Sequence, residues 1–153
     1  MGKEISLDMC AVTTVDDADY TWLNQWNWHL STAGYAVRPG KPKIRMHRVI
    51  LEAPLDMEVD HINRNRLDNR RANLRLCTDA QTAMNRTKQR RKCSSKYKGV
   101  CWSKEKRRWM AHIQKNYEQL YLGYFEAEED AARAYNKAAR ELHGEFAALN
   151  EIS

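Results

Sequence analysis

Residues 59–78 read VDHINRNRLDNRRANLRLCT, and their pattern predicts the central module of this chain. Asp60 and His61 stand between two apolar residues, a frame that is typical of a short β-strand. Residues 74–77 alternate between leucine and polar or smaller side chains and predict a second strand. Residues 63–73, rich in Asn, Asp and Arg, then form the loop that joins two antiparallel strands.

A helix is expected to follow the second strand. Thr78 is a typical N-cap residue, and Gln81 three positions later completes a capping-box pattern. On the first strand, Asp60 and His61 point to opposite faces, so both reach one reaction centre only if the strand bends or ends there. Two strands and a helix therefore carry a compact Asp-His site.

Five short motifs in and after this stretch resemble the HNH endonucleases, specifically the phage and intron-encoded homing type built on a ββα-metal fold. They are DHIN at 60–63, DN at 68–69, NLR at 73–75, Thr78 and NR at 85–86. Residues 46–50, MHRVI, also look like the helix that precedes the motif in that family. The resemblance covers roughly residues 46–87.

The resemblance implies that His61 is the general base and that Asn73 orients it. It makes Asp60 a ligand of one divalent cation, Mg²⁺ or Mn²⁺, which carboxylate and amide oxygens suit. Thr82 stands where the family has a second metal-binding Asn or His, and a hydroxyl is a poorer ligand. Asn85, one turn later, either replaces it or is only the neighbouring Asn that the family also shows in its Asn-Arg pair. A neutral imidazole can accept a proton from water near neutral pH, and the cation absorbs the charge that develops on the phosphate.

Residues 96–150 predict three antiparallel strands followed by one amphipathic helix. The motifs YKGV at 97–100, LGYF at 122–125 and EDAARAYNKAA at 129–139 resemble the AP2 DNA-binding domain. In that family the sheet enters the major groove. Cys101, His112 and Gln114 stand where several plant members carry Arg, Glu and Arg, so the target sequence cannot be predicted.

Basic and aromatic residues are expected to contact DNA. Those near the HNH motif are predicted from their positive charge, and those of the last module are implied by the AP2 resemblance. They are Arg64, Arg66, Arg70, Arg71, Arg75, Arg86, Lys98, Lys104, Arg108, Trp109 and Tyr121.

The first 45 residues predict a helix that starts near Asp16 and a hairpin formed by residues 28–30 and 35–38. We assign the tryptophans of this segment to the core, namely Trp22, Trp26 and Trp28.

Charge and composition point to a polyanionic partner. The 153 residues are 42% hydrophobic and 30% charged, which suits a folded protein, and the net charge is +6. Residues 38–115 hold 22 Lys and Arg against seven Asp and Glu, a concentration typical of nucleic-acid binding. The four cysteines form no closely spaced pair, which argues against a zinc site. No apolar run is long enough for a membrane span, and no secretory leader is visible.

We therefore expect an α+β chain: residues 1–45 a β-rich accessory segment, 46–88 the HNH ββα-metal module, 89–95 a basic linker, and 96–150 an AP2-like three-stranded sheet plus helix. The expected function is metal-dependent, site-specific cleavage of double-stranded DNA. Alternatives are a catalytically degenerate DNA-binding regulator and, on charge alone, an RNA-binding or structural protein. We expect a monomer without a small-molecule cofactor, encoded by a phage or mobile element and located in the cytoplasm of a bacterial host.

Overall fold

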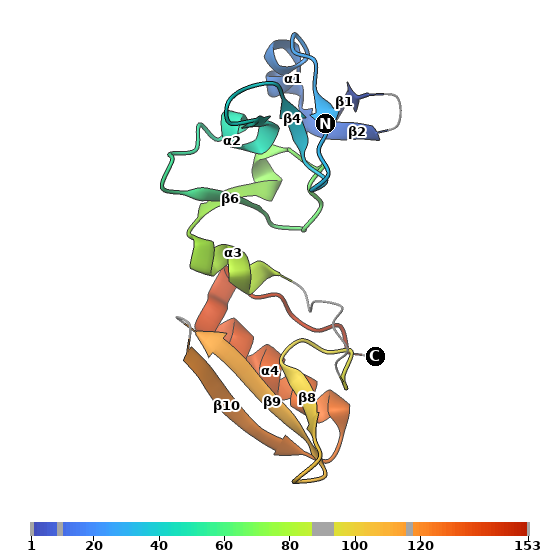
Figure 1. The fold of residues 1–153 in the computed structure, drawn as a ribbon, viewed down its shortest axis with the longest axis vertical. Coiled ribbons are helices and arrows are strands. Elements are labelled where there is room, and N and C mark those ends of the chain that lie inside the picture. The colour runs from blue at the N-terminus through green and yellow to red at the C-terminus, as the bar shows by residue number, and fades with distance from the viewer. Residues whose placement is uncertain (1, 9–10, 87–93, 116–117, 153) are drawn as a thin grey trace. The chain divides into compact units, whose positions relative to one another are not determined.

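The structure is a computed structural model that describes residues 2–8, 11–86, 94–115 and 118–152. The chain divides into two compact units, Met1–Thr82 and Ala83–Ser153, and each is described by itself (Figure 1). Residues 89–93 of the expected basic linker lie outside the described residues. No described helix is long and apolar enough to cross a membrane.

The first unit combines short antiparallel sheets with short helices. Its strands are β1 (Gly2–Leu7), β2 (Ala11–Asp16), β3 (His29–Leu30), β4 (Ala36–Arg38), β5 (Ile44–Arg45), β6 (Glu58–His61) and β7 (Leu74–Cys77). Its helical segments are α1 (Asp17–Leu23), α2 (Met46–Ile50), the 3-10 turn η1 (Arg71–Asn73) and the first part of α3 (Asp79–Asn85). β1 pairs with β2, β6 pairs with β7, and the third sheet has the order β3-β4-β5.

One hydrophobic core unites the whole first unit. Its buried side chains come from β1, β2, α1, β4, α2, β6 and β7, so the first 45 residues share their core with the Asp-His strand. They are Ile5, Leu7, Val15, Leu23, Trp28, Ala36, Met46, Ile50, Val59 and Leu74.

The three tryptophans do not share one environment. Trp28 is buried, and its indole N–H donates to the carbonyl oxygen of Leu23 at 2.8 Å, while Trp22 packs at the edge of the core. Assigning Trp26 to the core was wrong, because α1 ends at Leu23 and the indole of Trp26 is 44% exposed. The guanidinium of Arg38 stacks on it, 4.1 Å from the ring centroid.

The second unit is a three-stranded antiparallel sheet covered by one long helix. The strands are β8 (Val100–Ser103), β9 (Arg108–Lys115) and β10 (Glu118–Phe125), in the order β10-β9-β8. The helix is α4 (Glu128–His143), followed by the 3-10 turn η2 (Gly144–Phe146). Alanines at 131, 132 and 139 are buried and let α4 pack closely on the sheet. The predicted α+β class and the sheet-plus-helix module are confirmed.

Gly99 allows this close approach of helix and sheet. Its φ is +72°, a left-handed conformation that side chains disfavour. A Cβ atom added there would lie 2.1 Å from Cδ2 of Tyr135 and 2.5 Å from the carbonyl oxygen of His112. Both the backbone turn and the packing of α4 therefore require glycine at this position.

Candidate active site

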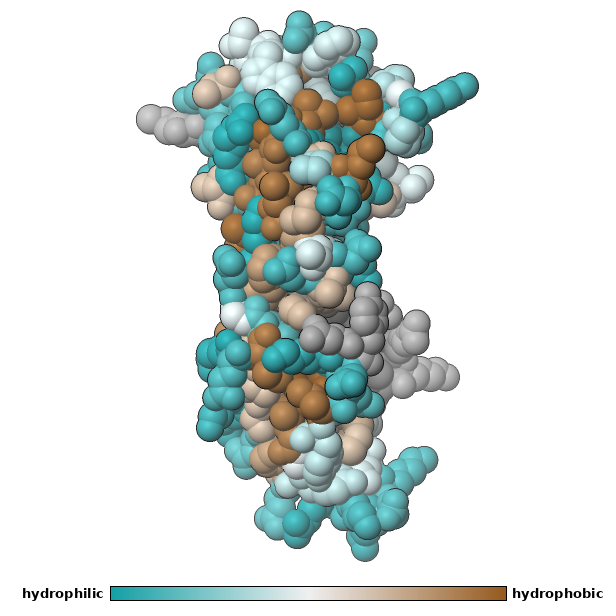
Figure 2. Space-filling model, turned by 90° about the vertical axis from the view of Figure 1, so that its left-hand side faces the viewer, coloured by the Kyte–Doolittle hydropathy of each residue, from teal (hydrophilic) through white to brown (hydrophobic). Residues whose placement is uncertain are grey.

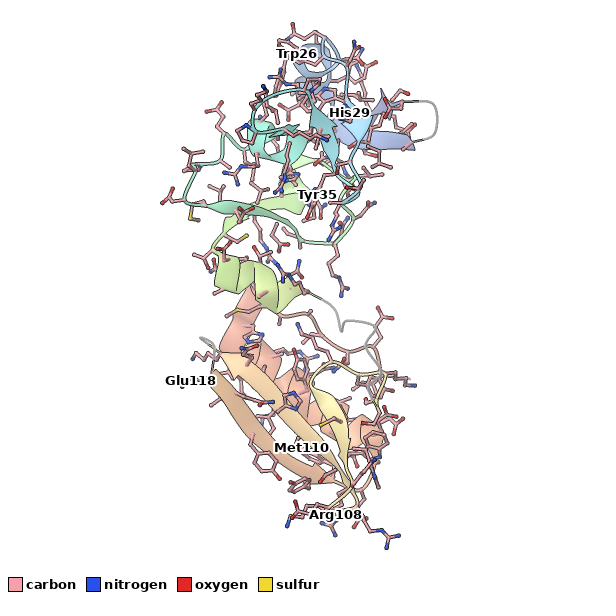
Figure 3. The ribbon with its side chains drawn as sticks, viewed as in Figure 1. Trp26, His29, Tyr35, Arg108, Met110 and Glu118 are labelled. Carbon is pink, nitrogen blue, oxygen red and sulfur yellow. The ribbon has the colours of Figure 1, made fainter. Side chains whose placement is uncertain are left out.

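His61 is the last residue of β6 and is buried among aromatic rings. The ring of His47, from α2, lies 5.1 Å from it in an edge-on arrangement, and the ring of Tyr35 lies 6.1 Å away. Figure 3 places Tyr35 beside β6. Tyr35 could not be connected with this site from the sequence, because a loop aromatic has no periodic pattern that reveals its neighbours.

The side chain of Asn69 lies within hydrogen-bond distance of the His61 ring. Nε2 of His61 lies 3.1 Å from Oδ1 of Asn69, whose side chain is fully buried in the 63–73 loop. The amide nitrogen of Asn69 donates in turn to the hydroxyl of Thr13 on β2 at 2.7 Å. The sequence placed Asn69 in a motif but did not link it to His61, and nothing in the sequence marked Thr13.

Asn73 holds the loop between β6 and β7 closed. Its Oδ1 accepts a hydrogen bond from the backbone N–H of Asn63 at 2.9 Å, and its Nδ2 donates to the carbonyl oxygen of Asp68 at 2.8 Å. The resemblance implied that Asn73 orients His61. In the structure the amide of Asn73 bonds backbone groups of the loop, and the side chain within hydrogen-bond distance of the ring is that of Asn69.

Burial keeps both histidines neutral at physiological pH. Desolvation lowers the pKa of His61 below its usual range, and the hydrogen bond to Asn69 opposes this shift. Desolvation, with positive charge on His61 and Arg45, lowers the pKa of His47 to about 3. A neutral imidazole retains a lone pair that can accept a proton, which a general base requires.

Asp60 lies on the other face of β6 from His61. It pairs across the ribbon with Arg75, and the guanidinium contacts its Oδ2 at 2.8 Å from Nη2 and 3.2 Å from Nε. Both side chains are only 11% exposed. A positively charged group therefore already contacts this carboxylate. The strand β6 ends one residue after Asp60.

The chemistry of Asp60 fits a hard divalent cation, but the structure does not bring a full ligand set to it. In the described part of the chain, no three His, Cys, Asp or Glu side chains cluster as a metal site. The hydroxyl of Thr82 lies 3.2 Å from the carbonyl oxygen of Thr78 and 3.1 Å from Sγ of Cys77. Asn85 is buried at the end of α3 and belongs to the second unit. A cation on Asp60 would thus take most of its ligands from water and phosphate, as Mg²⁺ commonly does.

Several arginines around the loop are engaged with carboxylates of the chain itself. Arg70 pairs with Asp68 at 2.7 Å, and Arg71 pairs with Asp19 at 2.8 Å. These contacts lower the pKa of both carboxyls. Arg75 is likewise paired with the carboxylate described above, so three of the five arginines near the motif bring less net charge to a phosphate than the sequence suggested.

The other two arginines of this group differ from one another. Arg66 donates to the carbonyl oxygen of Ala33 at 2.6 Å and stacks over Tyr35, 4.8 Å from the ring centroid. Arg64 is exposed in a left-handed turn with φ 65°. Among the described residues, neither guanidinium forms an ion pair with a carboxylate, so both suit contact with a phosphate.

The face of the second unit's sheet opposite α4 carries exposed aromatic side chains. A bulge in β10 between Tyr121 and Gly123 puts both Tyr121 and Tyr124 on this face, opposite His112 and Met110 of β9. The two tyrosine rings lie 5.3 Å apart, and Tyr121 is 56% exposed. Figure 2 shows hydrophobic residues gathered in patches on the visible face of each unit.

The remaining residues expected to contact DNA lie in three kinds of environment. Lys104, Arg108 and Arg86 are exposed, and Figure 3 shows Arg108 at the end of the sheet away from Glu118. Trp109 packs against the helix-side core and stacks edge-on with Trp102, which does not support a contact from the open face. The ammonium of Lys98 bonds the carbonyl oxygens of Met84 and Arg86 at 2.7 and 2.5 Å, which leaves it less available to DNA.

Comparison with known proteins agrees with both parts of this description. A family model described as HNH endonuclease matches residues 45–84, and the AP2 domain model matches residues 95–145. An uncharacterized HNH endonuclease of Acanthamoeba polyphaga mimivirus is 37% identical over 136 residues, which cover 85% of this chain and 70% of that protein.

Plant relatives match only the second unit. An AP2-like ethylene-responsive transcription factor of Arabidopsis thaliana is 42% identical over 59 residues, or 39% of this chain and 12% of that protein. APETALA2-like protein 2 of Oryza sativa subsp. indica is 42% identical over 57 residues, or 37% of this chain and 13% of that protein. No solved structure matches significantly. The long match to the viral protein and the two domain matches show that this chain belongs to the HNH endonuclease family and carries an AP2 domain.

Proposed function

We propose that this protein is a metal-dependent, site-specific DNA endonuclease of the homing type. The observation that carries the proposal is the pairing, in one chain, of an HNH segment with a DNA-binding domain, as the two matched families indicate. The relative encoded by a virus suits the expected origin in a mobile element. The target is double-stranded DNA.

His61 acts as the general base. It accepts a proton from water, whose oxygen attacks the phosphorus while the bond from phosphorus to one ester oxygen breaks. Its neutral form, favoured by burial, supports this role, and the contact with Asn69 restrains the ring. The rings of Tyr35 and His47 limit access of bulk water to one side of the imidazole.

Asp60 would hold Mg²⁺ or Mn²⁺, with Thr82 or Asn85 as the residue that would supply a further ligand. When bound, the cation stabilises negative charge on the phosphate and on the leaving oxygen. The guanidinium of Arg75 contacts Oδ2 of Asp60, so it would compete with the cation for this carboxylate. The position of Asp60 one residue before the end of β6 supports access to the same phosphate that His61 serves.

The second unit supplies sequence recognition through the open face of its sheet. Tyr121 and Tyr124 offer flat apolar surface, and Lys104 and Arg108 offer positive charge at the sheet's end. Phosphate contacts position such a sheet on the duplex, and contacts with base edges select the sequence.

Plasmid cleavage tests the proposal. Purified protein with Mg²⁺ or Mn²⁺ should nick or cut a plasmid that carries the DNA flanking the chain's own gene. EDTA should abolish cleavage, and so should Asp60→Asn, which keeps the size of the side chain but removes its charge. Cleavage that persists in EDTA or in Asp60→Asn would contradict the metal-dependent mechanism.

A catalytically degenerate DNA-binding protein is the second candidate. Two observations favour it: a hydroxyl stands at position 82, and a guanidinium already neutralises Asp60. This candidate predicts salt-sensitive DNA binding with no cleavage in any metal. Thr82→Asn should restore activity if the site has decayed by loss of a ligand, and wild-type cleavage would exclude this candidate.

A further inference from the structure

β2, in the first 45 residues, contacts the loop that carries Asn69. The backbone N–H of Thr14 donates to the carbonyl oxygen of Leu67 at 2.8 Å, and the N–H of Asn69 donates to the carbonyl oxygen of Thr14 at 2.7 Å. Further along, Asp16 accepts from the backbone N–H of Arg71 at 2.8 Å. This strand therefore fixes the loop on which the partner of His61 stands, although it lies outside the residues that match the HNH family.

Side chains continue these contacts as an ordered chain of hydrogen bonds. The hydroxyl of Thr13 donates to the carbonyl oxygen of Leu67 at 2.8 Å and accepts from the amide nitrogen of Asn69 at 2.7 Å. Oδ1 of Asn69 then faces Nε2 of His61 at 3.1 Å. Thr13 and Asn69 are both fully buried, so these groups depend on one another for partners.

Each bond in this chain has only one direction. A carbonyl oxygen can only accept, so the single proton of the Thr13 hydroxyl goes to Leu67. The Asn69 atom that faces the hydroxyl must then be the NH₂ group, because an oxygen there would leave two acceptors in contact. Asn69 thus turns its oxygen to His61, and an oxygen requires a protonated Nε2. The lone pair of the neutral ring is left on Nδ1.

We propose that Thr13 is a positioning residue of the nuclease site: its hydroxyl, through Asn69, fixes His61 in the tautomer with hydrogen on Nε2 and the lone pair on Nδ1. The inference rests on the proposed function for its catalytic consequence, but the tautomer itself is a property of the folded chain. A segment outside the HNH match thereby sets which nitrogen of His61 can accept a proton.

Three variants of the full chain distinguish the effect of the Thr13 hydroxyl from that of the packing around it. Thr13→Val has nearly the same shape but no hydroxyl, so Asn69 loses its fixed orientation. Thr13→Ser keeps the hydroxyl and should behave as wild type. Thr14→Val, the matched control, alters the neighbouring residue, which contributes backbone groups to the same contact.

Nitrogen-15 NMR of the histidine rings measures the tautomer directly, without DNA or metal. We expect the Nε2–H form of His61 in the wild type, Thr13→Ser and Thr14→Val, and a mixture of tautomers in Thr13→Val. Cleavage by Thr13→Val should fall about ten-fold, the loss expected for one buried hydrogen bond, with unchanged DNA affinity.

The outcomes separate the inference from the proposed function. A wild-type ring with hydrogen on Nδ1 overturns the inference even if Thr13→Val does not fold, and so does a folded Thr13→Val that keeps both the wild-type tautomer and the wild-type rate. If the tautomer responds to Thr13→Val as expected but the wild type cuts no DNA, the positioning role of Thr13 is supported and the proposed nuclease function is wrong.

Discussion

Removing the positive partner of Asp60 should strongly destabilise the first unit. Asp60 and Arg75 are each 11% exposed and share hydrogen bonds of 2.8 and 3.2 Å. Removing one partner of a buried ion pair costs about 3–5 kcal/mol, because the other charge stays desolvated. Since this pair lies near the end of a two-stranded ribbon, we expect Arg75→Met to cost about 3 kcal/mol. For a unit of this size, the melting temperature would fall by roughly 15 °C.

The double variant Asp60→Asn/Arg75→Met distinguishes this cause from a general loss of packing. It leaves no unpaired charge, so it should cost about 1 kcal/mol or less relative to the wild type. As an exposed control, Arg133→Met breaks a pair with Asp130 whose side chains are 61% and 55% exposed, and should cost under about 0.5 kcal/mol.

Urea unfolding followed by NMR signals of β6 and β7 reports on the first unit alone, which matters because the two units need not unfold together. Stabilisation by added metal provides a second measurement. If Arg75 and the cation compete for Asp60, Mn²⁺ at about 100 times its Kd should return about 2.7 kcal/mol to Arg75→Met and less to the wild type. If Arg75→Met is as stable as the wild type, or if the double variant is as unstable as the single one, the unpaired buried charge of Asp60 is not the cause of destabilisation.

Three further predictions follow from the geometry. Gly99→Ala should destabilise the second unit by roughly 3 kcal/mol in chemical denaturation, because its Cβ would meet the ring of Tyr135 at φ +72°. His47 has a pKa of about 3 in the fold, against 6.5 when unfolded. The unfolded chain binds more protons between these values, so the contribution of His47 to stability should be complete above about pH 6.5 and fall by up to roughly 5 kcal/mol as the pH drops toward 3. In His47→Gln the slope should become shallower without vanishing, because burial also lowers the pKa of His61. In DNA-binding titrations over a range of salt concentrations, Arg108→Gln should lower the salt slope by about 1, while Tyr121→Ala should weaken binding with the slope unchanged.

The sheet-plus-helix unit could be predicted almost completely from its sequence. Apolar alternation in residues 108–113 and 120–125, and alanines at helical spacing, fix the faces that meet, and β9, β10 and α4 follow this pattern. The bulge in β10 could not be predicted in this way, because strict alternation would put Tyr121 and Tyr124 on opposite faces. Trp109 differs from this case: alternation in β9 places it with the core-facing residues, where it packs, and the expected DNA contact came from the AP2 resemblance instead.

The candidate site was predictable in its local parts only. The strand with Asp60 and His61, the loop and the second strand all follow from residues 58–77, and β6 and β7 pair as expected. The partners from distant segments, Thr13 and Tyr35, carry no local signal, because their roles arise from tertiary packing across tens of residues. A long loop rich in Asn and Arg likewise gives no indication of which arginines pair with carboxylates of the chain itself.

The role of His61 as general base is tested by the single-turnover rate of DNA cleavage by His61→Ala, measured with the enzyme in excess over its DNA. His29→Ala, which changes a histidine of β3, is the matched control, and circular dichroism checks that both variants fold. We predict that both bind DNA as the wild type does, that His29→Ala cuts at the wild-type rate, and that His61→Ala cuts at least about 100-fold more slowly. Cleavage by folded His61→Ala at the wild-type rate would show that His61 is not the general base.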